Sequence, residues 1–229
     1  MASDDTRKLA ETVIVAPTDP IYRALRRAGS CSGKDGRIDL FRYSLLPESA
    51  HGVAIVGPAL GAPAAALLVE RLAREAVTRI VLFSVCGSLM SNLRVGDLFI
   101  PTGGLSEEGT SKLYSAGEIP APDRKLSNRL VGESRRIGLK PREGLIWTTD
   151  APYRETTEKI DRFRKAGAMA VDMEFTAMAT VCRFHKILFS ALMVVSDERT
   201  GGEPTIGFGS LTYREGLRQG MEALFHVTG

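Results

Sequence analysis

Two acidic residues stand where a carboxyl group can do chemistry. Glu174 opens a largely apolar segment, and Asp197 follows the apolar run 188–195 and Ser196. A carboxylate can accept hydrogen bonds from two vicinal hydroxyls at once, as on a ribose. A carboxylic acid at a strand end can serve as a general acid. Each residue also has a simpler interpretation, because Glu174 would suit a helix N-terminus and Asp197 a turn or a cap. The residue types alone leave both interpretations open.

Two glycine-containing turns are further candidates for ligand contact. Cys86 and Gly87 follow the most apolar run, where exposed backbone can line a slot the size of a base. Cys86 is better explained as a packing residue than as a nucleophile, since no histidine is near in sequence to activate it. The turn Gly57–Gly61 precedes a helical segment, so it can either bring backbone amides to an anion or simply reverse the chain.

Composition narrows the function classes. The chain has 229 residues, of which 44% are hydrophobic and 25% charged, with a net charge of +3. These values are typical of a globular protein and exclude collagen-like and disordered classes. The small charge excess does not favour nucleic acid or an anionic membrane as a partner. We expect one domain over residues 1–229, with residues 1–10 flexible.

Three cysteines and the absence of a long apolar stretch bear on location. Cys31, Cys86 and Cys182 are odd in number and widely spaced, so they suggest neither a disulfide framework nor a metal site. No run of about 20 apolar residues is present, and the N-terminus opens polar and acidic, unlike a secretory signal. We therefore expect a cytoplasmic protein that does not enter the membrane and holds no metal.

Short apolar runs alternate with helical patterns along the chain. The runs are apolar on both faces, which is typical of strands in a sheet covered on both sides. A further segment, Arg37–Leu46, alternates and is expected to form one outer strand. The expected strands are 11–16, 53–56, 79–85, 95–100 (ending at Pro101), 145–147 and 187–195, and the expected helices are 62–74, 123–137, 155–166, 173–184 and 208–226.

This alternation predicts an α/β fold with a parallel or mixed sheet. In such folds, ligands bind at the carboxyl ends of the strands. Four turns should therefore carry the chemistry, and they are 17–20, 57–61, 84–88 and 196–199.

In their order and spacing, several segments resemble one enzyme family. The most specific are Val171-Asp172-Met173-Glu174 and Val195-Ser196-Asp197. Others are 56–63, 84–89, 95–98, 108–111 with Tyr114, and 149–150 with Tyr153. Together, from about Val13 to Phe225, they resemble the nucleoside phosphorylase family, which includes purine nucleoside and uridine phosphorylases and the nucleosidases of methylthioadenosine and adenosylhomocysteine. The resemblance implies a three-layer α/β/α sandwich around a central mixed β-sheet. It also implies a homo-oligomer built from dimers, of which a hexamer is one form.

The resemblance also implies a reaction and the residues for it. The bond between base and ribose would break, with a nucleoside as substrate, inorganic phosphate as co-substrate and no cofactor. Glu174 would hold the ribose hydroxyls and Met173 would pack on the sugar. Asp197 would be catalytic, because it would donate a proton or hydrogen bond to purine N7 and so neutralise the charge that leaves with the base. Uridine phosphorylases differ at this aspartate, which favours a purine. The base would be lined by Cys86, Gly87, Tyr153 and Val171.

The nucleophile side departs from the family pattern. Where the phosphorylases hold phosphate with a glycine, two arginines and a hydroxyl side chain, this chain has Thr18, Tyr22, Leu82 and Val85. A phosphate dianion needs charge-assisted donors, so Arg23 or Arg154, or Arg42 from a neighbouring subunit, would have to converge there. Asp19 is the nearest carboxylate that could activate water instead.

Three hypotheses therefore stay open: phosphorolysis with a rebuilt phosphate site, phosphate-independent hydrolysis, or nucleoside binding without turnover. Pro152, at a position where the family stacks an aromatic ring on the base, would widen the pocket.

Overall fold

The structure is a computed structural model that describes residues 9–31, 33, 35–47, 52–75, 77–115, 120–200 and 203–228. Residues 1–8 of the segment expected to be flexible lie outside the described residues, whereas Leu9 already packs into the core. No helix in the described part of the chain is long and apolar enough to cross a membrane.

One mixed sheet of ten strands organises the described residues. Its order is β10-β9-β6-β7-β8-β5-β1-β4-β3-β2, and β9 also pairs with β5, so that β5, β9, β6, β7 and β8 close into a ring. The strands are β1 (Thr12–Val15), β2 (Gly36–Ile38), β3 (Phe41–Leu45), β4 (Val53–Gly57), β5 (Arg79–Ser88), β6 (Leu98–Ser106), β7 (Arg142–Thr148), β8 (Ala168–Asp172), β9 (Leu188–Glu198) and β10 (Thr205–Ile206).

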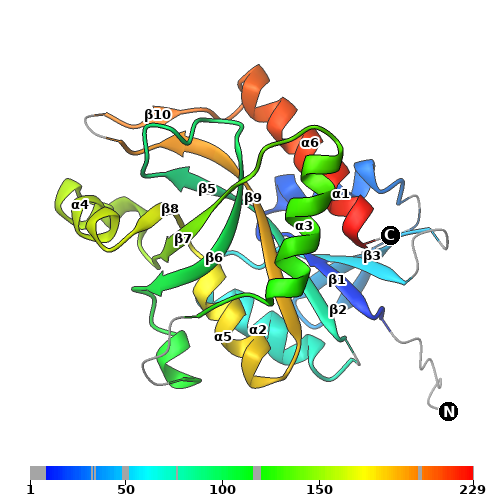
Figure 1. Cartoon of the computed structure of the whole chain (residues 1–229). Helices are drawn as coiled ribbons and strands as arrows, with labels where there is room; N and C mark the ends of the chain where they lie inside the picture. The colour runs from blue at the N-terminus through cyan, green and yellow to red at the C-terminus, as the bar shows by residue number, and fades with distance from the viewer. Residues whose placement is uncertain are drawn as a thin grey trace, which may run out of the picture.

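Helices cover both faces of this sheet (Figure 1). One core cluster contains residues of α2 and α5, which pack against each other, and the other contains residues of α1, α3 and α6. The predicted three-layer α/β/α sandwich is therefore confirmed. The helices are α1 (Asp19–Ala28), α2 (Ala62–Leu72), α3 (Arg124–Arg136), α4 (Thr157–Lys165), α5 (Phe175–Phe184) and α6 (Leu211–Thr228), with two short 3-10 turns, η2 (Ser111–Leu113) and η3 (Pro152–Arg154).

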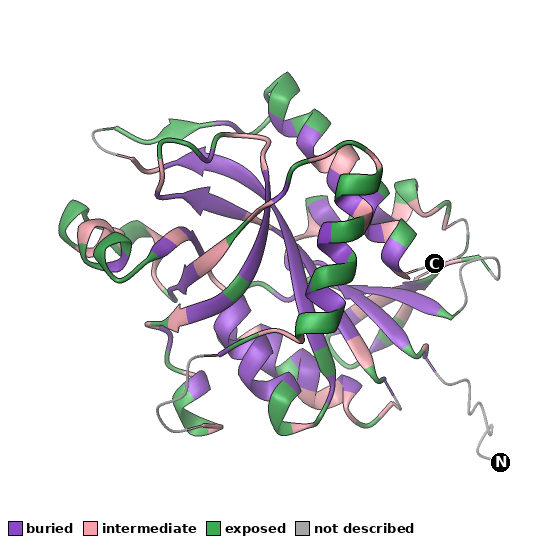
Figure 2. Ribbon diagram, viewed as in Figure 1, coloured by how far each residue is buried: buried purple, intermediate pink, exposed green. Residues whose placement is uncertain are grey.

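The two-sided cover explains why the strands are apolar throughout. Successive side chains of a strand point to opposite faces. Val13 and Val15 of β1 therefore join the α2–α5 core, while Ile14 between them joins the core under α1, α3 and α6. In β5, Leu82 and Phe83 divide in the same way, and β1, β4, β5, β8 and β9 are buried along most of their length (Figure 2).

Several elements differ from the expectation. The segment 37–46 is not one strand but the hairpin of β2 and β3, which turns at Asp39 with a positive φ of 52° that aspartate tolerates. Helix α1 and strand β8 were not expected, and α1 starts right after Thr18 with Pro20 in its first turn. Pro101 does not end β6, since the strand continues to Ser106 with a register shift beside the proline.

Candidate active site

A pocket of about 190 Å³ opens at the last residues of β5, β8 and β9. All four turns singled out in the sequence contribute to its wall. Three further segments take part: the loop between β7 and α4, the end of β8 with the residues before α5, and Phe208 before α6. The lining residues are Pro17, Thr18, Leu60, Ser84, Val85, Cys86, Gly87, Pro152, Glu155, Val171, Asp172, Met173, Glu174, Ser196, Asp197, Arg199 and Phe208.

Gly87 is the point at which three strands meet. β5 does not stop at Cys86-Gly87 but runs on to Ser88, so Gly87 pairs with Val171 of β8 on one side and Asp197 of β9 on the other. The register shifts here, because Cys86 faces Val195 whereas Gly87 faces Asp197, which leaves Ser196 as an extra residue. Such bulges redirect side chains near functional sites. A Cβ on Gly87 would lie 3.2 Å from Asp197 Oδ2 and 3.0 Å from Val171 Cγ1, so glycine lets both neighbours close over it.

The Asp197 carboxyl group is held on both oxygens. Its Oδ1 accepts a hydrogen bond from the Ser196 hydroxyl at 2.8 Å, and its Oδ2 accepts one from Arg199 Nε at 2.8 Å. The side chain is buried, with 8% of the residue exposed. The carboxyl group is therefore fixed in one orientation at the pocket wall.

Glu174 is buried and does not act as a helix cap. The amides at the start of α5, those of Glu174 just before the helix and of its first residue Phe175, donate to Asp172 Oδ2 at 3.1 and 2.7 Å. Since Asp172 satisfies them, the Glu174 side chain is left for the pocket, where its Oε1 accepts a hydrogen bond from the Gly61 amide at 2.8 Å. Gly61 has φ +84°, a conformation that suits glycine, and this is how the turn before α2 reaches the carboxylate.

At this end of the pocket, burial raises the pKa values of two groups, Glu174 and Cys86. Burial, and next the Asp172 carboxylate, raise the pKa of Glu174, while the Gly61 and Met173 amides oppose the rise. Burial also raises the pKa of the Cys86 thiol well above its usual value. Cys86 thus stays a thiol, as a packing residue would.

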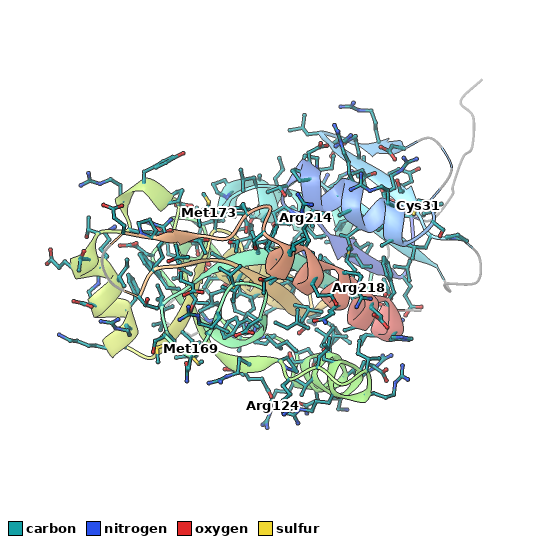
Figure 3. The ribbon with its side chains drawn as sticks, turned by 90° about the horizontal axis from the view of Figure 1, so that it is seen from above. Cys31, Arg124, Met169, Met173, Arg214 and Arg218 are labelled. Carbon is teal, nitrogen blue, oxygen red and sulfur yellow. The ribbon has the colours of Figure 1, made fainter. Side chains whose placement is uncertain are left out.

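Met173 lies between β8 and α5, in the segment labelled in Figure 3, and lines the pocket beside Glu174. Cys86, Gly87 and Val171 line it from β5 and β8. The structure therefore brings the predicted ribose residues and three of the four predicted base residues into one cavity. Thr18 and Val85, from the predicted nucleophile side, line it as well.

Four predicted residues lie elsewhere. Tyr22 is 1% exposed and its hydroxyl shares a hydrogen bond with Ser44, because it belongs to the apolar face of α1. Asp19 and Arg23 form an ion pair on the outside of α1, with a nitrogen–oxygen distance of 2.7 Å. Tyr153 is 99% exposed, because η3 turns it outward. None of the four is among the lining residues of this pocket.

Positive charge is scarce in the pocket. Among its described lining residues, Arg199 is the one Lys or Arg side chain. Within the chain, Arg42 contacts Asp19 and Arg154 lies in the wall of a separate surface hollow, so neither lines this pocket. Leu82 is fully buried in the α2–α5 core. The described residues also contain no group of three or more His, Cys, Asp and Glu side chains that could hold a metal ion.

The sequence interpretation missed two charged residues of the pocket. Arg199 lies directly after β9 in the predicted turn 196–199, and its spacing of two residues from Asp197, which places side chains on one face of a strand, could have indicated its role. Glu155 follows η3, and its side chain is only 6% exposed. No periodicity marks Glu155, because it belongs to a loop.

The chain is similar to known proteins in sequence. A family model described as "Phosphorylase superfamily" matches residues 18–222. The guanosine phosphorylase of Halorubrum lacusprofundi is 31% identical over 193 residues, which cover 83% of this chain and 80% of that protein. A purine nucleoside phosphorylase of the DeoD type from Caldanaerobacter subterraneus is 26% identical over 156 residues, or 67% of each protein.

Two solved structures share the fold. The purine nucleoside phosphorylase of Toxoplasma gondii, in complex with immucillin-H, aligns with a TM-score of 0.86 over 97% of this chain and 92% of its own, at 16% identity. The AMP nucleosidase of Bacteroides thetaiotaomicron aligns with a TM-score of 0.74 over 94% and 87%, at 19% identity. At these identities the likeness concerns the fold.

Proposed function

Since this chain belongs to the phosphorylase superfamily, we propose that it cleaves the N-glycosidic bond of a purine nucleoside and transfers the ribosyl group to inorganic phosphate. The observation that carries this proposal is the pairing of two buried carboxyl groups, Glu174 and Asp197, in one pocket. The names of the relatives, which are guanosine and purine nucleoside phosphorylases, support the substrate class.

Glu174 binds the ribose in this proposal. A carboxylate held by the Gly61 amide through Oε1 can accept hydrogen bonds from the 2′- and 3′-hydroxyls. Met173 lines the pocket beside it and offers an adaptable apolar surface to the sugar. This fixes the ribose while its anomeric carbon develops oxocarbenium character.

Asp197 acts on the base. As the glycosidic bond breaks, the electron pair leaves with the purine, and negative charge gathers on its imidazole ring. A proton or hydrogen bond from Asp197 to N7 neutralises that charge in a site shielded from water, which is where such stabilisation is strongest. Ser196 and Arg199 hold the carboxyl group in place for this step. Cys86, Gly87 and Val171 form the wall against which the base lies.

The acceptor side carries Thr18, Ser84 and Val85. Hydroxyl groups there can position phosphate, and a second subunit is the source we propose for further positive charge, in a homo-oligomer built from dimers. A cytoplasmic location, which fits three free cysteines, belongs to the same proposal. The scarcity of cationic lining residues favours hydrolysis as the second candidate reaction, with water in place of phosphate.

Release of free base from a panel of nucleosides, measured with and without phosphate, tests the proposal. We expect purine release that depends on phosphate. Release that is equally fast without phosphate would identify a nucleosidase. Nucleoside binding without any release would show that the pocket has no turnover.

A further inference from the structure

The loop before α4 places a second acidic residue in the pocket. The Glu155 side chain is 94% buried and lines the cavity. Its Oε2 has no hydrogen-bond partner among the described residues, and the closest charge is Arg199 Nη1 at 3.5 Å. A buried carboxylate oxygen without a hydrogen bond is costly, so its retention in a pocket needs an explanation.

Arg199 contacts two carboxyl groups of the pocket wall. Asp197 is joined to Arg199 at 2.8 Å, and Arg199 in turn faces Glu155 at 3.5 Å. Along these contacts the order is therefore the carboxyl group of Asp197, the guanidinium of Arg199 and the carboxylate of Glu155. Arg199 has five N–H donors and can serve both neighbours and a ligand atom.

The edge of a 6-oxopurine has the matching order. From N7 it presents an acceptor at N7, an acceptor at O6, and a donor at N1–H, to which guanine adds the donor of its 2-amino group. With Asp197 at N7, Arg199 would meet O6 and Glu155 would meet the donors at N1 and N2. Adenine presents a donor at position 6 and an acceptor at N1, which oppose the guanidinium and the carboxylate.

We propose that Glu155, together with Arg199, selects 6-oxopurine nucleosides, and guanosine above the others, by accepting hydrogen bonds from N1–H and the 2-amino group. This inference rests on the proposed function for the placement of the base against Asp197. Glu155 is a specificity residue here and not a catalytic one.

Equilibrium binding separates this inference from turnover. The affinities of guanosine, inosine and adenosine are measured by isothermal titration calorimetry for the wild type, Glu155→Gln, Glu155→Ala and the control Glu158→Gln, which changes an exposed carboxylate on α4. We expect the wild type to bind guanosine most tightly and adenosine most weakly. Both Glu155 variants should lose about 10- to 100-fold in guanosine affinity, as when a charged hydrogen-bond partner is removed. Adenosine affinity should change less than about threefold.

The ratio of guanosine to inosine affinity is the decisive readout. It reports the 2-amino group alone, so it should fall toward one in the Glu155 variants and stay at the wild-type value in Glu158→Gln. A merely structural role would weaken all three nucleosides equally and overturn the inference. Turnover without preference for 6-oxopurines would leave the proposed function standing and contradict the role of Glu155. Selective binding of guanosine without turnover would support the role of Glu155 and contradict the proposed function.

Discussion

At the scale of single residues, the account depends on which carboxyl group does what. Asp172 satisfies the first amides of α5, which leaves Glu174 to the pocket. Asp197 is fixed between Ser196 and Arg199. The same residue type thus serves as a cap in one place and as a functional group in another, and only the hydrogen bonds separate the two uses.

Asp197→Asn removes the acid that meets the leaving base. We expect the kcat for purine release to fall by about 10²-fold or more, in line with general-acid contributions. Steady-state kinetics with guanosine and phosphate measure this, with Asp161→Asn on α4 as the control. An unchanged kcat would mean that Asp197 does not act on the base.

Glu174→Ala removes the acceptor for the ribose hydroxyls. We expect kcat/KM for guanosine to fall by about 10- to 100-fold, the range for a lost charged hydrogen bond. The loss should be smaller for 2′-deoxyguanosine, because it lacks one of the two hydroxyls. If both nucleosides lose equally, Glu174 holds the pocket together and does not bind the sugar.

The burial of Glu155 also predicts how the thermal stability of the protein depends on pH. Burial raises its pKa to about 7, with Asp197 adding to the rise and Arg199 opposing it. The folded protein then binds this proton more tightly than the unfolded chain, so the contribution of Glu155 to stability falls as pH rises from about 4.5 to 7. Glu155→Gln should therefore gain in Tm relative to the wild type between pH 5 and pH 8. Thermal unfolding at these two pH values tests this, and a Tm difference independent of pH would contradict it.

At the scale of elements, the meeting of β5, β8 and β9 at Gly87 positions both the base wall and Asp197. Gly87→Ala would press a methyl group against Val171 and the Asp197 carboxyl group, at 3.0 and 3.2 Å. We expect a loss of about tenfold or more in kcat, since small misplacements of reacting groups are expensive. Gly132→Ala on α3, where a Cβ meets nothing within 4 Å, is the matched control. If Gly87→Ala is as active as Gly132→Ala, the strand junction does not position Asp197.

The elements were largely predictable because the strands are apolar on both faces and end in glycine-, proline- or serine-containing turns. The sequence did not predict where single side chains within these elements point. Tyr22 aligned with a phosphate-site position, yet the apolar face of α1, with Ile21 and Leu25, takes it into the core. Tyr153 was expected at the base, yet η3 places its neighbours Pro152 and Glu155 in the pocket instead. The helix face takes Tyr22 into the core, and the 3-10 turn leaves Pro152 rather than Tyr153 in the pocket wall, and family spacing does not contain that information.

At the scale of the whole molecule, the four predicted turns meet because strands far apart in sequence become neighbours. β5 pairs with β9, more than 100 residues later, and this long pairing brings Cys86 and Gly87 beside Asp197. Spacing along the chain suggested that these turns share an edge of the sheet. It did not indicate the ring formed by β5, β9, β6, β7 and β8, nor that the loop between β7 and α4 supplies Glu155.

The most direct test of the central claim is the conversion of guanosine in the presence of phosphate, followed by 31P NMR. The account predicts that inorganic phosphate is consumed and ribose 1-phosphate appears in step with free guanine, at a rate that Asp197→Asn lowers by about 10²-fold. Guanosine that stays intact with the wild-type protein, while the protein binds it, would contradict the claim that this pocket cleaves the glycosidic bond.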